Sequence, residues 1–239
     1  MKAILLSAGL GTRLRPITST IPKCLVSVNG KPMLQHWIEK LAPLGVQEFL
    51  INTHYLRHKV EDFFSTYQRA AKINLVHEKE LFGTAGTILN NAAFVDQDCF
   101  IVHTDTFVAE NLTGFLRFHH DAPQFLYSAV GFAVEDPAPF GTFLLDSENT
   151  VEGFSEKNPA SRSRIASAAC FLVRPRFLDW MREVTPDARD FSADTLVKTS
   201  GVGRVYMTSG AVFDIGCIES LEACERYVAV ANQHQGEGR

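Results

Sequence analysis

The stretch "LLSAGLGTRLRPITSTIPK", residues 5–23, decides how the start of the chain is interpreted. It overlaps the apolar run "KAILL" (2–6), which predicts a short buried strand, and it then turns through Gly9 and Gly11. Glycines after a strand let the backbone approach a ligand closely, with successive N–H groups pointing at an anion. Basic residues follow the turn at Arg13, Arg15 and Lys23. The stretch therefore predicts a phosphate-binding loop.

Helix-like and strand-like segments alternate through the first half of the chain. Apolar residues at helical spacing predict helices over residues 31–45, 58–70 and about 84–93. Short apolar runs predict strands over residues 48–53, 73–77 and 99–105. Because such alternation with short connections is typical of a mostly parallel sheet flanked by helices, we expect a Rossmann-like α/β arrangement in residues 1–122.

The pattern changes after about Pro123. The strand-like runs "QFLYSAVGFAV", "GTFLLD" and "TVEGFSE" follow one another with turn residues between them and few helical stretches. We expect a smaller antiparallel lobe in residues 123–232, with a final helix at 219–233 and a tail at 233–239. Because no linker or internal repeat interrupts the chain, the prediction is a single domain, residues 1–232, with two halves.

Composition restricts the class of protein. The formal net charge is −4, so nothing overall indicates a nucleic-acid partner. Five scattered cysteines without a C-x-x-C pair favour reduced thiols, and no stretch reaches transmembrane length or looks like a signal peptide. We therefore expect a cytoplasmic protein without a membrane partner, present as a monomer or a small homo-oligomer.

Two common phosphate-binding motifs do not fit the glycine turn. A P-loop requires G-x-x-x-x-G-K-[ST], which the chain lacks. A dinucleotide-binding turn requires a third glycine, but Leu14 occupies that position and Pro16 prevents a helix from simply running on. A dehydrogenase is therefore a weaker alternative.

A third scheme fits the sequence over nearly its whole length. "GLGTRLRP", then "PK", then "VNGKPML" resembles the nucleotidyltransferases that activate sugar 1-phosphates. The resemblance continues through "ELFGTAGTI" (80–88), "VHTDTF" (102–107), "VEGFSEKNP" (151–159) and "VFDIGCIESLEAC" (212–224). The chain is identified as a member of the short, single-domain type of this family, which implies a glycosyltransferase-A-like fold with a sugar-binding lobe.

The resemblance implies the reaction and its residues. A sugar 1-phosphate attacks the α-phosphorus of a nucleoside triphosphate, giving an NDP-sugar and pyrophosphate. The implied catalytic residues are Arg13, Lys23 and Asp105. The implied nucleotide-binding residues are Ala8, Gly9, Gly11, Thr12, Glu80, Gly83, Thr84 and Gly86. The implied sugar-phosphate-binding residues are Gly141, Glu156, Lys157 and Ser167. The role of Arg15 stays open between phosphate contact and surface charge.

Two aspartates point to magnesium. Asp105 ends an apolar strand at the expected carboxyl edge of the sheet, where ligands bind in open α/β folds. Asp214 lies between Phe213 and Ile215, where an unpaired carboxylate would be costly. The resemblance brings both to one site, and Mg²⁺ typically takes one or two carboxylates together with substrate phosphate oxygens.

The substrates stay open at this level. Glu80 beside "GTAG" favours GTP, with UTP close behind, and the product would serve surface polysaccharide or cell-wall precursors. Alternatives are a uridylyltransferase for N-acetylmuramate 1-phosphate, a cytidylyltransferase for phosphocholine-like substrates, and a non-catalytic nucleotide-sugar sensor. Ser167 and Ala169 replace an asparagine and a glycine that family members often carry, which leaves the sugar undetermined.

Overall fold

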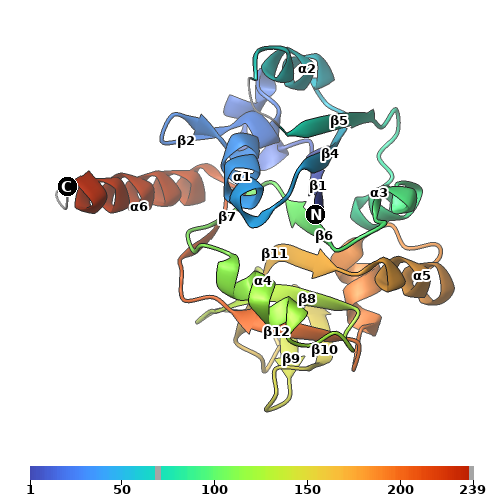
Figure 1. The fold of residues 1–239 in the computed structure, drawn as a ribbon. Coiled ribbons are helices and arrows are strands. Elements are labelled where there is room, and N and C mark those ends of the chain that lie inside the picture. Colours follow the sequence, from blue (N-terminus) through green and yellow to red (C-terminus); the bar gives the residue numbers. More distant parts are fainter. Residues whose placement is uncertain (68–70, 237–239) are drawn as a thin grey trace.

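A computed structural model describes residues 1–67 and 71–236. Within these residues, nine strands form one sheet, whose main path runs β10-β9-β11-β6-β1-β4-β5, with β8 paired to both β11 and β12 (Figure 1). The strands of this sheet are β1 (Lys2–Leu6), β4 (Glu48–Thr53), β5 (Lys72–His77), β6 (Cys99–His103), β8 (Tyr127–Ala133), β9 (Gly141–Leu145), β10 (Val151–Glu156), β11 (Ile165–Val173) and β12 (Gly203–Met207). This is the mostly parallel α/β class that the sequence predicts.

The first half of the chain supplies the parallel part of the sheet. β1 lies between β4 and β6 and pairs with both in parallel, with Leu5 opposite Ile51 on one side and Val102 on the other. β5 extends this part in parallel beyond β4. Because parallel strands end at the same edge, the residues that follow β1, β4 and β6 come together there.

The antiparallel half continues the same sheet and does not form a separate one. β11 pairs antiparallel with β6, and β8 and β9 pair antiparallel with β11. β12 adds to β8 in parallel, so this half is mixed where the sequence suggested only antiparallel pairing. The long strand β11 thus lies directly beside β6, the strand that precedes Asp105.

Helices cover both faces of the sheet. They are α1 (Met33–Leu41), α2 (Arg57–Thr66), α3 (Thr84–Asn90), α4 (Thr113–His120), α5 (Pro175–Val184) and α6 (Ile218–Gly236). Alternate residues of β1 explain the two layers: Ala3 and Leu5 join a core with α1, α4 and the start of α6, whereas Ile4 and Leu6 join a core with α3 and α5. A parallel strand with both faces buried is expected to be apolar, as the four buried residues Ala3–Leu6 after Lys2 are.

Several predicted boundaries differ from the structure. The helix predicted at 31–45 is α1 followed by a 3-10 turn at Ala42–Leu44, since Pro32 precedes the helix and Pro43 interrupts it. The helix predicted at 58–70 ends at Thr66, and its last three positions lie outside the described residues. The helix predicted at 84–93 ends at Asn90 and is followed by a 3-10 turn. α5, which begins at Pro175, was missed.

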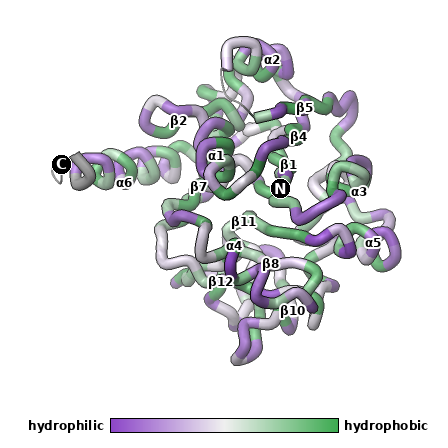
Figure 2. Tube along the Cα trace, viewed as in Figure 1, coloured by the Kyte–Doolittle hydropathy of each residue, from purple (hydrophilic) through white to green (hydrophobic). Residues whose placement is uncertain are grey.

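The final helix is longer than predicted. α6 continues to Gly236, three residues beyond the expected end at 233, and the remainder of the predicted tail, 237–239, lies outside the described residues. Leu221 and Cys224 near its start are buried in the core. Figure 1 shows its far end extending away from the body, and Figure 2 shows hydrophilic and hydrophobic residues interspersed along it. Among the described residues, no helix is both long and apolar enough to cross a membrane.

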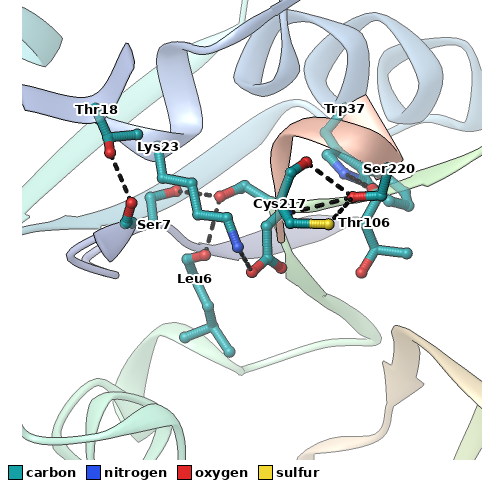
Figure 3. A network of polar contacts seen from close by, with 11 residues as sticks. Leu6, Ser7, Thr18, Lys23, Trp37, Thr106, Cys217 and Ser220 are labelled. Atoms are coloured by element: carbon teal, nitrogen blue, oxygen red, sulfur yellow. Dashed lines mark hydrogen bonds and ion pairs between the residues drawn. The ribbon is translucent and has the colours of Figure 1, made fainter. Parts of the chain in front are cut away.

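Two short ladders complete the fold around the carboxyl edge of the sheet. β7 (Thr106–Val108) pairs antiparallel with β13 (Val212–Asp214), and β2 (Ser27–Val28) pairs with β3 (Lys31–Pro32). The indole Nε1 of Trp37 in α1 donates to the backbone oxygen of Thr106 at 2.8 Å, so α1 fixes the position of β7 (Figure 3). This small ladder brings Asp214 next to the end of β6.

Candidate active site

Two cavities adjoin at the carboxyl edge of the parallel strands. The first cavity has a volume of about 230 Å³ and is lined by Leu6, Ser7, Ala8, Gly9, Lys23, Cys24, Asn52, Glu78, Leu81, Gly83, Thr84, Thr87, His103, Thr104 and Asp105. The second cavity, of about 260 Å³, is lined by Arg13, Thr84, His103, Asp105, Thr106, Phe132, Pro139, Phe140, Gly141, Glu156, Lys157, Ser167, Ala169, Asp190, Ser192, Val212 and Asp214. They share Thr84, His103 and Asp105, so a ligand in one can meet a ligand in the other.

A buried polar network forms the wall of the first cavity. Asn52, at the end of β4, accepts a hydrogen bond from the Ser7 backbone N–H at 2.6 Å and donates to Glu78 Oε1 at 2.8 Å. The Thr87 hydroxyl in α3 also donates to Glu78 Oε1, at 2.5 Å, and the Phe82 backbone N–H donates to Oε2 at 3.2 Å. Glu78 is only 1% exposed. Because buried polar groups require partners, this network holds the carboxylate in one orientation.

The glycine loop after β1 is folded tightly. Gly11 has φ +63°, and its carbonyl accepts a hydrogen bond of 2.6 Å from the Thr18 hydroxyl. A Cβ at Gly11 would lie 2.9 Å from Cγ2 of Thr18, so the loop requires glycine there for both conformation and space. The buried Leu14 anchors the 3-10 turn that follows, which leaves Arg13 exposed toward the second cavity.

Lys23 and Asp105 form an ion pair where the cavities meet. The Lys23 Nζ donates to Asp105 Oδ2 at 2.5 Å, and the two side chains are 11% and 34% exposed (Figure 3). Burial acts to raise the pKa of Asp105, but the charge of Lys23, together with His103 and the hydrogen bonds to the carboxylate, outweighs burial and holds that pKa below its ordinary value. Asp105 is therefore a carboxylate at neutral pH.

Asp214 adds a second carboxylate beside the first. It lies opposite Thr106 in the β7–β13 ladder, and the Ile215 backbone N–H donates to the Asp105 backbone oxygen at 2.7 Å. Although Asp214 is open to solvent on one side, surrounding protein and the charge of Asp105 raise its pKa above the ordinary value. Two like charges held together in this way favour a cation between them.

Arg13 lies against the same group. A Cβ at Gly216 would be 2.9 Å from Nη2 of Arg13 and 3.2 Å from Oδ2 of Asp214, so both charged groups border this glycine. The start of α6 is fixed here by Ser220, whose hydroxyl donates to the Cys217 backbone oxygen at 3.0 Å (Figure 3). Positive and negative groups thus alternate around the junction, an arrangement that suits a bound polyanion and a cation together.

The far wall of the second cavity comes from β9, β10 and β11. Glu156 ends β10, and its pKa is raised by burial despite the Lys157 ammonium, whose Nζ is 3.5 Å from Glu156 Oε1. A Cβ at Gly141 would lie 2.6 Å from Glu156 Oε2 and 2.4 Å from Phe154, so Gly141 gives this carboxylate its space. The wall offers hydrogen-bond acceptors next to a cation.

Two residues of the second cavity adopt a conformation that usually belongs to glycine. Lys157 has φ +45° and Ala169 has φ +49°. Ala169 lies in an irregular part of β11 where pairing to β8 shifts between Ser167 and Phe171, and its N–H donates to the Ser167 hydroxyl at 3.2 Å. For residues with a Cβ this conformation costs about 1–2 kcal/mol. Strained backbone of this kind is frequent at ligand sites.

The structure brings most of the predicted site residues together. Ala8, Gly9, Lys23, Gly83, Thr84 and Asp105 line the first cavity, and Arg13, Gly141, Glu156, Lys157, Ser167 and Asp214 line the second, together with Thr84 and Asp105. Gly11, Thr12, Gly86, Glu80 and Arg15 line neither cavity. Gly11 acts through the fold of its loop, and a Cβ at Gly86 would meet Phe82 at 3.1 Å, which indicates a packing role.

The predicted nucleotide-binding residue Glu80 lines neither cavity, but Glu78, two positions earlier, lines the first. Glu80 is exposed, whereas Glu78 is buried in the first cavity. From the sequence, Glu80 was expected to contact the nucleotide because it is the acidic residue nearest to "GTAG". The available signal was that Glu78 directly follows β5, so it lies at the sheet edge where ligands bind.

Other cavity residues were also missed. They are Ser7, Asn52, Thr87, His103 and Thr104 in the first cavity, and Asp190 and Ser192 in the second. Asn52 stands out as an amide in the buried strand "EFLINT", which is a signal that could have been used. His103 borders both cavities, its Nε2 is shielded from solvent without a partner among the described residues, and burial lowers its pKa.

Comparisons with known proteins were made for sequence and for structure. The chain is 32% identical over 225 residues to the bifunctional protein GlmU of Methanocaldococcus jannaschii, a match that covers 90% of this chain and 52% of the relative. It is 31% identical over 185 residues to a mannose-1-phosphate guanyltransferase of Schizosaccharomyces pombe, covering 75% of this chain and 51% of the relative. The chain thus spans about half the length of the curated relatives it matches.

The fold has a similar counterpart among solved structures. A putative glucose-1-phosphate thymidylyltransferase from Bacillus anthracis superposes with a TM-score of 0.84 at 22% identity, covering 95% of this chain and 94% of that one. At this level of sequence identity, the similarity shows a shared fold. The family described as nucleotidyl transferase matches residues 2–229, nearly the whole chain, including both cavities. This chain belongs to the nucleotidyl transferase family.

Proposed function

We propose that the protein transfers a nucleoside monophosphate from a nucleoside triphosphate to a sugar 1-phosphate. The observation that carries this proposal is the junction of the two cavities, where Lys23, Arg13, Asp105 and Asp214 gather. Family membership and the sugar-phosphate substrates in the names of the relatives support it.

The chemistry follows from what these side chains can do. A phosphate oxygen of the sugar 1-phosphate attacks the α-phosphorus, a new P–O bond forms, and the bond between the α- and β-phosphates breaks as pyrophosphate leaves. Two polyanions must approach each other, so Arg13 and Lys23 contribute by neutralising charge that accumulates during transfer. The cavities contribute by holding both reactants in line, and no covalent intermediate with the protein is needed.

Asp105 and Asp214 would hold a Mg²⁺ ion in this proposal. Their donor chemistry fits, since both present carboxylate oxygens and Asp105 raises the pKa of Asp214 by its charge, a repulsion that a divalent cation relieves. When bound, the ion would neutralise negative charge on the phosphates. Lys23, which pairs with Asp105 here, can then turn its ammonium to the triphosphate.

GTP is the proposed nucleotide, with UTP second. Glu78 presents a buried carboxylate in the wall of the first cavity, and its Oε2 accepts only one protein hydrogen bond among the described residues. A carboxylate accepts and does not donate. Guanine offers two adjacent donors, N1–H and the N2 amino group, and uracil offers one, N3–H. Adenine and cytosine each offer an amino group, but it lies beside an unprotonated ring nitrogen that a carboxylate would repel. Glu78 thus takes the role that the sequence had suggested for Glu80.

A substrate matrix tests the reaction. Purified protein with each of four nucleoside triphosphates is combined with a panel of sugar 1-phosphates, and pyrophosphate release is measured. We expect the highest rates with GTP and a sugar 1-phosphate. Phosphocholine with CTP and N-acetylmuramate 1-phosphate with UTP test the two alternative transferases. Nucleotide binding without pyrophosphate release from any pairing would contradict transferase activity and support a sensor.

A matched pair of variants tests the base assignment. Glu78→Gln should lower kcat/KM for GTP by about 10-fold or more and reduce the ratio of kcat/KM for GTP to that for UTP, because the negative charge is lost and one acceptor oxygen becomes an amide donor. Glu80→Gln makes the same chemical change at an exposed residue, and it should leave kcat/KM for GTP and the GTP-to-UTP ratio unchanged. A loss in Glu80→Gln with none in Glu78→Gln would reverse the assignment.

The cellular location is also proposed. All five cysteines lie in the described part of the chain, are unpaired, and are mostly buried. Unpaired cysteines favour a reducing compartment, so we propose the cytoplasm.

A further inference from the structure

A segment of the second half enters the site beside the nucleotide loop. Asp190 and Ser192 line the second cavity, although they come from the turn after α5 rather than from its wall of strands. Neither residue belongs to the motifs that the sequence analysis identified.

This segment is held by the "GTAG" residues. The Ala85 backbone N–H donates to the Arg189 backbone oxygen at 2.9 Å, and the Phe191 N–H donates to the Thr84 hydroxyl at 2.7 Å. A Cβ at Gly83 would be only 2.3 Å from that Arg189 oxygen, so glycine is required for the approach. The place of Asp190 is therefore set by the same helix start that borders the first cavity.

The Asp190 carboxylate is also oriented by its own turn. Its Oδ1 accepts hydrogen bonds from the backbone N–H groups of Ser192 and Ala193, each at 2.8 Å, and its own N–H donates to Asp194 Oδ2 at 2.8 Å. Among the described residues, Oδ2 of Asp190 accepts no hydrogen bond. One oxygen thus fixes the side chain while the other is free to accept from a ligand.

The charged groups near Asp190 indicate which ligand its Oδ2 can bind. The negative charge of Asp190 is close enough to Glu156 to help raise the pKa of that residue. The second cavity is lined by four carboxylates, the proposed metal pair Asp105 and Asp214 together with Glu156 and Asp190, and by two cations, Arg13 and Lys157. The cations suit a phosphate, whereas the carboxylates of Glu156 and Asp190 suit the hydroxyl groups of a neutral sugar ring and repel an acidic one.

We propose that Asp190 binds hydroxyl groups of the sugar and, together with Glu156, restricts the second cavity to sugar 1-phosphates whose ring carries no anionic group. The inference rests on the proposed function and narrows its substrate class. It excludes sugar acids and lactyl-bearing sugars, including N-acetylmuramate 1-phosphate, by electrostatics rather than by size.

The test compares neutral and acidic substrates of similar size. Glucose 1-phosphate, mannose 1-phosphate and glucuronate 1-phosphate are assayed with the preferred nucleotide. The wild-type protein should use at least one neutral substrate about 100-fold better than glucuronate 1-phosphate, since an unpaired charge in the site is rejected strongly. Asp190→Asn should raise the KM for the neutral sugar about 10-fold, leave the KM for the nucleotide unchanged, and reduce the discrimination against the acid about 10-fold.

Two further variants separate binding from folding. Asp190→Ser keeps one side-chain oxygen that can accept hydrogen bonds from the turn, but it lacks the second acceptor oxygen. This variant should therefore fold with an unchanged melting temperature and still bind the sugar more weakly. Asp187→Asn, an exposed change in the same segment that lines neither cavity, should behave as wild type.

The outcomes distinguish this inference from the proposed function. Pyrophosphate release from no sugar 1-phosphate would overturn the proposed function itself. An active wild-type protein that uses glucuronate 1-phosphate as well as the neutral sugars would overturn the inference alone. The same holds if Asp190→Asn and Asp190→Ser fold normally and leave the KM for the sugar unchanged.

Discussion

The two cavities are built in different ways. The first cavity lies at the ends of parallel strands, its polar wall is a buried network around Glu78 and Asn52, and its positive-φ position, Gly83, is a glycine. The second cavity gathers exposed charges from both halves of the chain, and its positive-φ positions, Lys157 and Ala169, carry side chains.

The difference separates two kinds of recognition. The side chains of a buried hydrogen-bond network have no alternative partners, so they keep one arrangement. Such a network suits the part of a ligand that must always bind in the same position. Side chains on strand ends and turns can change without disturbing the core, which suits a part of the ligand that differs among related proteins. We infer that the first cavity fixes the reacting nucleotide, whereas the second selects the sugar. The predictions below test this division.

The largest effect is expected at the junction that both cavities share. Chelation should abolish activity and added Mg²⁺ should restore it, because two carboxylates and a triphosphate repel one another without a cation. Asp105→Asn and Asp214→Asn should each require much more Mg²⁺ or stay inactive, as measured by turnover against Mg²⁺ concentration. Full activity in excess chelator, or unchanged metal dependence in both variants, would show that these aspartates are structural.

The second-largest effect on activity is expected when one cationic side chain of each cavity is removed. Lys23→Ala and Arg13→Ala should fold normally and lower kcat/KM on the order of 100-fold or more, as expected when a preorganised charge-stabilising group is removed. Arg15→Ala is the matched control, since Arg15 is exposed and lines neither cavity. Steady-state kinetics measure all three variants. Near-normal turnover of Lys23→Ala or Arg13→Ala would contradict the assigned role.

Gly83 tests the rigid construction of the first cavity. Gly83→Ala should destabilise the protein by about 2 kcal/mol or more, because φ is +80° and the new Cβ would be 2.3 Å from the Arg189 oxygen. Denaturant unfolding measures the change. Gly45→Ala has a similar positive φ but open space around it, so it isolates the conformational cost from the clash. Equal losses in the two variants would mean that the Arg189 contact adds nothing.

Lys157 tests whether the second cavity acts on one substrate only. Lys157→Ala should raise the KM for the sugar 1-phosphate about 10-fold while the KM for the nucleotide changes little, since Lys157 lines only the second cavity. Lys79→Ala, an exposed change outside both cavities, serves as control. Equal weakening of both substrates would count against a division between the cavities.

The smallest effect is expected at Ala169. Ala169→Gly removes a conformational strain of about 1–2 kcal/mol but adds a cost of roughly 0.5–1 kcal/mol from the greater backbone entropy of the unfolded chain. The free energy of unfolding should therefore rise by no more than about 1.5 kcal/mol. Denaturant unfolding checks this, and a sugar panel checks whether the vacated methyl space changes preference. A clear loss of stability would mean that the Ala169 methyl packs usefully and that strain is not stored there.

Much of this arrangement follows from the sequence alone. The apolar runs of β1, β4 and β6, the amphipathic helices and the glycine turn depend on neighbouring residues, so periodicity and turn chemistry reveal them. Lys23, Asp105, Glu156 and Lys157, which line the cavities, could be selected from the sequence because each lies in a contiguous motif. The parallel half of the sheet could be predicted for the same reason, since short connections leave few ways to arrange its strands.

Only the tertiary structure decided which residues share a cavity. Thr84 and Phe191 are 107 positions apart and meet through one hydrogen bond, and no local pattern encodes such a contact. Glu78 rather than Glu80 lines the first cavity because of how the chain leaves β5, where Asn52 and Thr87 of α3 donate hydrogen bonds to Glu78. Long-range packing also pairs β11 with β6, which joins the predicted antiparallel lobe to the parallel strands in one continuous sheet. Local chemistry defines the elements, whereas the burial of surfaces distant in sequence places their ends together.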